Sequence, residues 1–238
     1  MSSIDDREWV REQYATEDNL AARKSAYAHI EGPDTVELIF ETVVACRPRR
    51  VLEVGGGEGE LAARVVRELG ADLIGVDQSE RMVAIQRSKG IDAHVGTVEQ
   101  LPFANDEFDT VLAVWMLYHA ADLDRALSEL ARVLQRRGRL IAVTNAADHL
   151  HELAQLAGAP DLNASTSFRS DTGEEALLRH FARVERRDVR GWVIMDDETV
   201  RRYAQSWDAL APAAHRLPLD RPLRAQRAST IFVAEKAA

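Results

Sequence analysis

Short apolar segments alternate with amphipathic helical segments through the middle of this 238-residue chain. The apolar segments lie at 51–54, 73–76, 91–95, 110–114 and 140–143, and helices are expected between them at 61–69, 80–88 and 122–136. Strands that alternate with helices form a parallel sheet, joined by right-handed crossovers and covered on both faces. With two later strand-like stretches, at 184–193 and 230–234, the pattern predicts an α/β fold on a doubly wound, mostly parallel seven-stranded sheet.

The two ends of the chain have a different pattern. Residues 1–47 are predicted to form an N-terminal helical cap, in which Gly32 and Pro33 interrupt one helix and Asp34 caps the next. Further helices are expected at 148–157, 173–181 and 198–210. We expect one domain over residues 1–238, with a cap or lid at 1–47, a half at 48–145 that holds the parallel strands, and a half at 146–238 that closes the sheet.

Charge and cysteine content limit the partners of the chain. Its 30 basic and 39 acidic side chains give a net charge of −9, which disfavours binding to nucleic acid or to an anionic membrane. The single cysteine, Cys46, excludes an internal disulfide and a multi-cysteine zinc site. Neither a secretory signal nor an apolar run of the ~20 residues that span a bilayer is visible. We expect a cytoplasmic protein, monomeric or homodimeric.

The first predicted strand runs directly into a glycine-rich turn, Glu53-Val54-Gly55-Gly56-Gly57-Glu58-Gly59. Glycine permits positive φ and lets a ligand approach the backbone closely. The amides at the start of the following helix favour an anionic group, and ligands of open parallel sheets bind at this carboxyl edge. The turn is therefore a candidate ligand site, with the Glu53 side chain aimed into the crevice.

A second carboxylate narrows the class of ligand. Asp77 ends the second strand, 22 residues after Gly55, where a carboxylate can accept hydrogen bonds from both hydroxyls of a ribose. A dinucleotide site requires Gly-x-Gly-x-x-Gly, but the third glycine position holds Glu60, which would repel a pyrophosphate. A tight turn followed by a helix-capping aspartate is the structural alternative; the joint spacing favours a nucleoside ligand without phosphates.

The residues from about Arg49 to Val143 resemble a class I S-adenosylmethionine-dependent methyltransferase of the type 11 kind. The resemblance rests on Val51–Gly59, Gly75–Ser79, Leu101–Phe103, Phe108–Val111, Leu127–Leu134 and Gly138–Leu140. It implies a Rossmann-like methyltransferase fold with a cofactor-binding half at 48–145 and an acceptor-side half at 146–238. It also implies S-adenosylmethionine as cofactor and methyl transfer to O, N or C of a small-molecule acceptor. The alternative is a protein of this fold that binds S-adenosylmethionine without methyl transfer, as a cyclase or regulator. Glu60 counts against a third alternative, a nicotinamide oxidoreductase.

The resemblance also implies roles for individual residues. The methionine portion of the cofactor would face the glycine turn, and Asp77 would hold the ribose. Thr97 stands where aspartate is frequent in the family. Arg23 would pair with the cofactor carboxylate; the alternative is that Arg23 is an exposed helix arginine. The implied cofactor-binding residues are Glu53, Gly55, Gly57, Gly59, Asp77, Gln78, Met82, Thr97, Val98, Ala113, Trp115, Arg23 and Tyr14.

His119 is the candidate base, because its ordinary pKa suits proton transfer near neutrality; the alternative is a structural histidine. Tyr14 and Trp115 are expected to line the acceptor pocket, whereas Trp192 and Trp207 are expected to pack in the core. No metal site is expected. N-capping explains Asp196 and Asp197, and His149 and His151 are two apart, so they do not share a helix face.

Overall fold

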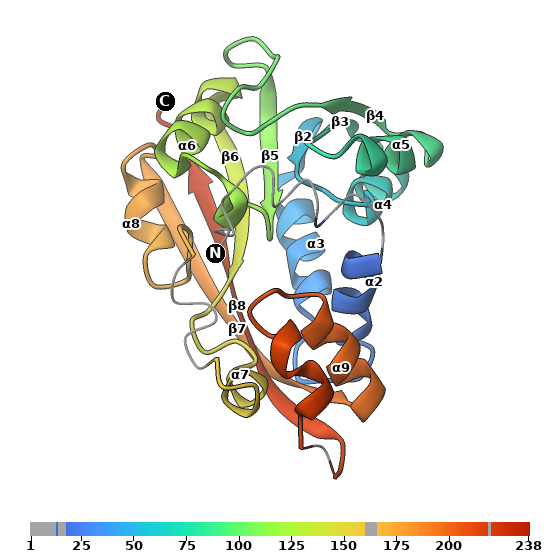
Figure 1. Ribbon diagram of the computed structural model, residues 1–238. Helices are drawn as coiled ribbons and strands as arrows, with labels where there is room; N and C mark the ends of the chain where they lie inside the picture. Colours follow the sequence, from blue (N-terminus) through green and yellow to red (C-terminus); the bar gives the residue numbers. More distant parts are fainter. Residues whose placement is uncertain (1–12, 14–17, 160–165, 219) are drawn as a thin grey trace.

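The computed structural model describes residue 13 and residues 18–159, 166–218 and 220–238. These residues form one mixed sheet of eight strands in the order β1-β7-β8-β6-β5-β2-β3-β4 (Figure 1). Strands β2 to β6 run parallel to one another, and β8 is antiparallel to both β6 and β7. The strands are β1 (Ile30–Glu31), β2 (Arg50–Val54), β3 (Asp72–Asp77), β4 (Asp92–Val95), β5 (Phe108–Val114), β6 (Leu134–Asn145), β7 (Arg183–Met195) and β8 (Leu223–Glu235).

The doubly wound, mostly parallel sheet is confirmed, but the predicted count of seven strands is one too low. The additional strand is β1, which pairs antiparallel with β7 through Ile30 and Val193. It lies in the segment that was expected to be wholly helical. The helix before it ends at Ser25, and Gly32 and Pro33 keep the next helix from starting before residue 35, so an extended stretch is left beside the edge of β7.

Four of the described helices begin at a side-chain cap. Asp34, Ser79, Asp122 and Asp196 each accept a hydrogen bond from a backbone N–H in the first turn of the helix that follows. The described helices are α2 (Asp18–Ser25), α3 (Thr35–Cys46), α4 (Glu60–Leu69), α5 (Glu80–Ser88), α6 (Leu123–Val133), α7 (His151–Leu156), α8 (Gly173–Leu178) and α9 (Asp197–Gln205), with 3-10 turns η1 (Leu117–His119) and η2 (Ala211–Arg216). None of them has the length and apolarity needed to cross a bilayer.

Alternate strand residues build one apolar layer on each face of the sheet. Val51 packs with residues of α3 and α4 on one face, whereas its neighbour Leu52 packs with residues of α6 and α8 on the other. From β2 the chain winds to β3 and β4, and then returns to place β5 on the other side of β2. The order therefore reverses between β2 and β5, and this switch point is where an open α/β sheet leaves a crevice for a ligand.

The antiparallel pair of strands β7 and β8 extends beyond the end of β6. β8 pairs with β6 only as far as Ser229, but it continues alongside β7 to Leu223. The extra length runs past the end of β6, and α7 and α9 pack on it in Figure 1. A third apolar cluster joins this extension to both helices, and its members include Leu153, Val193, Val200 and Tyr203.

Removing an apolar side chain from this third cluster is expected to destabilise the protein. Leu153 of α7 is fully buried, so Leu153→Ala leaves a cavity and lowers the free energy of unfolding by about 2–5 kcal/mol. Leu156 lies three residues away on the same helix and is 40% exposed, so Leu156→Ala is the matched control and should cost far less. Urea denaturation of both variants measures the difference, and equal losses would contradict the assignment of this cluster as core.

Candidate active site

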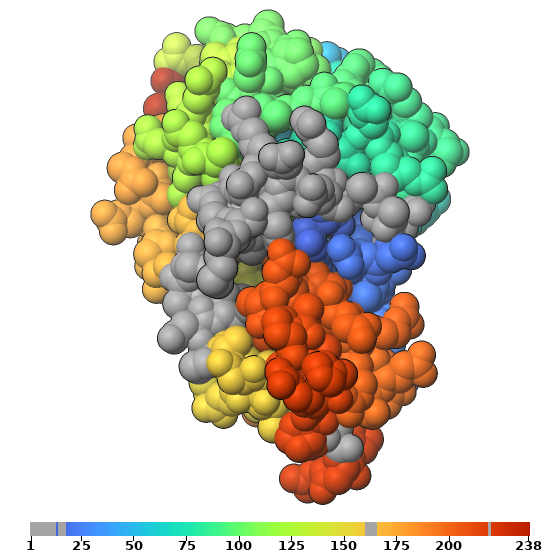
Figure 2. All heavy atoms as spheres, in the orientation of Figure 1, coloured from blue at the N-terminus to red at the C-terminus, as the bar shows by residue number. Residues whose placement is uncertain are grey.

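A cleft of about 740 Å³ opens at the switch point of the sheet. Its walls come from the glycine turn after β2, the ends of β3, β5 and β6, helix α2, and residues of α9 and β8. Helices α2 and α9 pack against each other and stand side by side in the space-filling view of Figure 2. Segments from the N-terminal cap and from the C-terminal half therefore meet over the same cleft.

Three neighbours hold the glycine turn in place. Gly57 has φ +56°; its N–H donates to Asp77 Oδ2 at 3.2 Å, and its carbonyl accepts from Gln86 Nε2 at 2.8 Å. The Leu20 side chain of α2 also lies against the turn, 3.4 Å from where a Gly57 Cβ would stand. Gln86 is fully buried on α5, and a Cβ at Gly75 would collide with its amide oxygen. Gln86 was not predicted as a site residue, although a glutamine on the buried face of a helix is a signal.

Glu53 is buried directly beside this turn. Only 2% of the residue is exposed, and its Oε2 atom has no hydrogen-bond partner among the described residues. Burial, together with the nearby charge of Asp77, raises the pKa of Glu53 to about 7. A Cβ at Gly56 would collide with this carboxylate, so a larger residue there would displace the Glu53 side chain. The site thus contains a buried acceptor oxygen that an incoming donor group can satisfy.

Asp77 lies at the end of β3 with both carboxylate oxygens oriented by the backbone. Oδ1 accepts from the Ser79 N–H at 2.9 Å, and Oδ2 accepts from the Gly57 N–H. Burial raises the pKa of Asp77 to about 6, although the hydrogen bonds from Ser79, Gly57 and Gln78 oppose that shift. A carboxylate has about four lone-pair sites, so Asp77 can still accept a hydrogen bond from a ligand hydroxyl beside these backbone donors.

The structure brings most of the predicted cofactor residues to the cleft but not all of them. Gln78, Thr97 and Val98 line it beside the glycine turn, together with Glu53, Gly55, Gly57, Asp77, Trp115 and Arg23. Met82, Gly59 and Ala113 do not. Met82 and Ala113 are fully buried in the core, and Gly59 caps α4 with Gln86 and Ile91 packed where its Cβ would stand. Tyr14 lies outside the described residues.

Trp115 and His119 follow β5 at the centre of the cleft. Trp115 has a positive φ of +52°, which is uncommon for a bulky residue, and its Nε1 donates to Asn145 Oδ1 at 3.1 Å. The same oxygen accepts from Ser229 Oγ at 3.1 Å, so the contacts continue from β5 through β6 to β8. The His119 ring packs edge-on against Tyr118, with ring centroids 4.5 Å apart.

The end of the cleft away from the glycine turn is also polar. Tyr27 Oη and His149 Nε2 are 2.8 Å apart, and His149 Nδ1 accepts from the Ala228 N–H at 3.1 Å. Burial lowers the pKa of His149 to about 4, and burial together with Tyr203 raises the pKa of Tyr27. Both side chains are therefore neutral at pH 7. Tyr27, Tyr203 and Arg227 were not predicted at this end of the cleft. They come from three distant segments of the chain, and no local sequence motif marks them.

Arg23 is buried, so the alternative of an exposed helix arginine is wrong. Its guanidinium stacks on Trp207 at 3.9 Å, and it donates to the Ser206 carbonyl and to Gln13 Oε1. Trp207 packs against the third apolar cluster, as expected, and it also lines the cleft. Trp192 lies outside the cleft wall, under the Arg224 guanidinium.

The described residues contain no cluster of histidine, cysteine or acidic side chains that could hold a metal ion. Asp196 accepts from the Thr199 N–H at 2.8 Å, which agrees with its expected role as a helix cap.

Comparison with known proteins gives the site its context. Residues 52–142 match the family described as a methyltransferase domain. The uncharacterized methyltransferase YcgJ of Bacillus subtilis is 34% identical over 120 residues, which cover 48% of this chain and 47% of that protein. Methyltransferase GfsG of Streptomyces halstedii is 32% identical over 117 residues, covering 46% of this chain and 42% of that protein. The chain spans about half the length of these curated relatives.

Solved structures extend the likeness of fold to the rest of the chain. The crystal structure of the cyclase SpnF superposes with a TM-score of 0.67 and covers 100% of this chain and 98% of that chain, at 19% identity. At that identity the likeness concerns the fold alone. The segment matched in sequence contains nearly all of the parallel strands from β2 to β6, which build the switch point and its glycine turn. Residues 52–142 therefore match a methyltransferase domain, and the fold around them is the Rossmann-like α/β fold of solved methyltransferases.

Proposed function

We propose that this protein transfers the methyl group of S-adenosylmethionine to a small-molecule acceptor. The observation that carries the proposal is that one cleft joins two compartments. Glu53, Asp77 and the glycine turn lie at one end, and the polar side chains of Tyr27, His149 and Arg227 lie at the other. Trp115 stands between them, at the end of β5. A donor and an acceptor can therefore lie in a single cleft, as group transfer requires.

The residues at the first end fit this cofactor. The free oxygen of Glu53 suits a donor such as an ammonium group, and Asp77 suits the two hydroxyls of a ribose. Glu60 opens α4 and pairs with Lys89 Nζ at 2.6 Å, a contact that lowers the pKa of Glu60 and keeps it ionised. A negative charge at this helix start is unfavourable for a pyrophosphate, as in a dinucleotide. The cofactor supplies a methyl group bound to a positively charged sulfur.

Positioning accounts for much of the proposed chemistry, because the donor is already activated. Trp115 and Met116 would define the reaction compartment beside the cofactor. His119 is the proposed base for an acceptor that must lose a proton; it lines the cleft two residues beyond the start of η1. We assign cofactor binding mainly to residues 48–145 and acceptor binding mainly to residues 146–238, with α2 of the cap contributing to both. The net charge of −9 favours a small acceptor over nucleic acid or membrane, and we propose a cytoplasmic monomer or homodimer.

A second candidate function is cofactor binding without methyl transfer. It is favoured by the likeness of fold to SpnF, which is a cyclase. The sequence relatives YcgJ and GfsG are methyltransferases by name, and they favour transfer. Formation of S-adenosylhomocysteine in the presence of candidate acceptors separates the two functions, because a cyclase or a regulator leaves the methyl group on the cofactor.

Thermal unfolding in the presence of ligands tests the cofactor assignment. S-adenosylmethionine and S-adenosylhomocysteine at one hundred times their Kd should each stabilise the protein by roughly 2.7 kcal/mol. NAD and NADP should leave the melting temperature unchanged, because Glu60 opposes their pyrophosphate. A shift with the nicotinamide cofactors alone would refute the proposed function.

Substitution of Asp77 should remove cofactor binding without unfolding the protein. Asp77→Ala deletes two charge-assisted hydrogen bonds to ribose, so the Kd for S-adenosylhomocysteine should rise roughly a hundredfold or more. Asp72→Ala, at the other end of the same strand, is the matched control; its carboxylate is exposed and pairs with Arg50 outside the cleft. Isothermal titration of both variants decides the point, and an unchanged affinity in Asp77→Ala would remove the ribose assignment.

Glu53 should make the ligand-free protein less stable as pH rises. Its folded-state pKa of about 7 exceeds the ordinary value of 4.5, so the folded protein holds a proton that the unfolded chain releases. This contribution is fully present below pH 4.5 and is lost as pH rises through 7. Glu53→Gln should therefore flatten the dependence and raise the free energy of unfolding at pH 8 by on the order of 2–3 kcal/mol.

Urea denaturation of wild type and Glu53→Gln at pH 5 and pH 8 measures this effect. The variant should at the same time bind S-adenosylmethionine more weakly, which is the trade-off expected of a functional acid. Parallel pH profiles for the two proteins would show that Glu53 does not titrate in this range.

A further inference from the structure

Arg227 carries a buried positive charge at the end of the cleft away from the glycine turn. It lies on β8 opposite Gly191 of β7, and only 5% of the residue is exposed. A Cβ at Gly191 would stand 3.0 Å from Arg227 Nη2, so glycine leaves room for the guanidinium. Arg227 also belongs to the lining of the cleft.

The protein compensates this charge only in part. Nη1 donates to Thr35 Oγ1 and Nη2 to the Pro33 carbonyl, while the buried Nε has no hydrogen-bond partner within the described ranges. No carboxylate in these ranges lies within ion-pair distance; the acid whose charge influences Arg227 most, Asp34, uses its Oδ1 atom to cap α3. The guanidinium also faces the start of α3, which is the positive end of a helix dipole.

A buried charge with so little compensation is costly for the protein alone. Removing a cation from water is unfavourable, and hydrogen bonds to neutral oxygens recover less of that free energy than a carboxylate does. Burial accordingly lowers the pKa of Arg227, although a guanidinium stays protonated at neutral pH. The neighbouring Tyr27 and His149 are neutral hydrogen-bonding groups, so they add no competing negative charge. An anionic ligand would complete the pairing.

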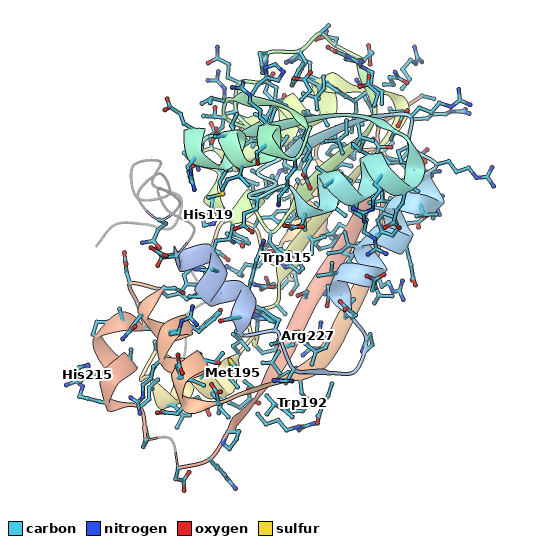
Figure 3. All side chains as sticks on the ribbon, turned by 90° about the vertical axis from the view of Figure 1, so that its right-hand side faces the viewer. Trp115, His119, Trp192, Met195, His215 and Arg227 are labelled. Atoms are coloured by element: carbon cyan, nitrogen blue, oxygen red, sulfur yellow. The ribbon has the colours of Figure 1, made fainter. Side chains whose placement is uncertain are left out.

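The position of Arg227 relates this charge to the reaction compartment. Trp115, Asn145 and Ser229 form a chain of contacts across three adjacent strands, and Arg227 lies two residues beyond Ser229 on the same face of β8. In the view of Figure 3, Trp115 lies between His119 and Arg227. Two strand spacings separate β5 from β8, and Arg227 lies four residues along β8 from Ile231, which is level with the end of β5, so Arg227 lies on the order of 16 Å from the end of β5.

We propose that the acceptor is a small organic acid, and that Arg227 binds its carboxylate while the nucleophilic atom reaches the compartment beside Trp115. This proposal rests on the proposed function and deepens it by naming the acceptor class. The planar guanidinium has five N–H donors, and the two contacts with Thr35 and Pro33 leave Nε and further Nη protons for a carboxylate.

The test compares acids with their neutral amides on protein saturated with S-adenosylhomocysteine. The probes are benzoate and 4-hydroxycinnamate, each paired with its primary amide, and binding is followed by the fluorescence of Trp115 and Trp207, which line the cleft. In the wild type, at least one acid should bind at least tenfold more tightly than its amide. Arg227→Met should abolish that preference, and Arg227→Lys, which keeps the charge but not the planar fork, should retain part of it.

Arg224→Met is the matched control. Arg224 lies on the same strand, but it pairs with Glu31 and stacks on Trp192 outside the cleft, so this variant should keep the wild-type preference. The affinity for S-adenosylhomocysteine is titrated first in every variant and reports an intact fold. Failure at that step in the wild type would refute the proposed function. With the cofactor product bound, equal affinity for acid and amide, survival of the preference in Arg227→Met, or absence of binding by either acid would overturn the inference.

Discussion

The peptide of Gly57 is the point on which the rest of the site depends. Its N–H is held by Asp77 at the end of β3, and its carbonyl is held by Gln86 from α5. Two elements that follow the turn in sequence thus fix a loop that would otherwise have the freedom of three consecutive glycines. The hydrogen bond from the Gly57 N–H also opposes the rise in the pKa of Asp77 that burial causes. Loop conformation and ligand electrostatics are therefore two consequences of one interaction.

The antiparallel pair of strands β7 and β8 determines the structure of the other end of the cleft. Because β8 continues beyond the last residue of β6, the N–H of Ala228 loses its neighbouring strand, and the His149 ring accepts its hydrogen bond instead. That contact holds the His149 ring against β8, with its second nitrogen 2.8 Å from Tyr27 Oη. The strand extension also carries Arg227 past the edge of the parallel sheet. A difference of a few residues in strand length thus creates a polar compartment.

The sequence predicted the parts of the molecule that local physics determines. The strand-to-glycine junction at Glu53, the carboxylate at Asp77 and the caps at Asp34 and Ser79 are each recognisable within a few residues. The far end of the cleft was not predictable in this way, because Tyr27 and Arg227 meet only through the insertion of β8 between β6 and β7. Helix α5 shows the same limit on a smaller scale. The resemblance favoured Met82 as a cofactor contact, but the packing of α5 buries Met82 and directs Gln86, four residues later, to the turn.

The two ends of the cleft carry charges of opposite sign, and this difference would orient the ligands. Glu53 and Asp77 make the end at the glycine turn acidic, and Arg227 makes the far end basic. A cofactor with a sulfonium and an ammonium group is attracted to the acidic end, and its positive charge opposes the rise in the pKa of Glu53 that burial and the charge of Asp77 cause. An acceptor with a carboxylate is attracted to the opposite end, so its uncharged portion is left beside Trp115. The charges at the two ends of the cleft would thus orient cofactor and acceptor before close contacts form. In this proposal, the long-range attraction of the acceptor carboxylate to Arg227 selects the acceptor.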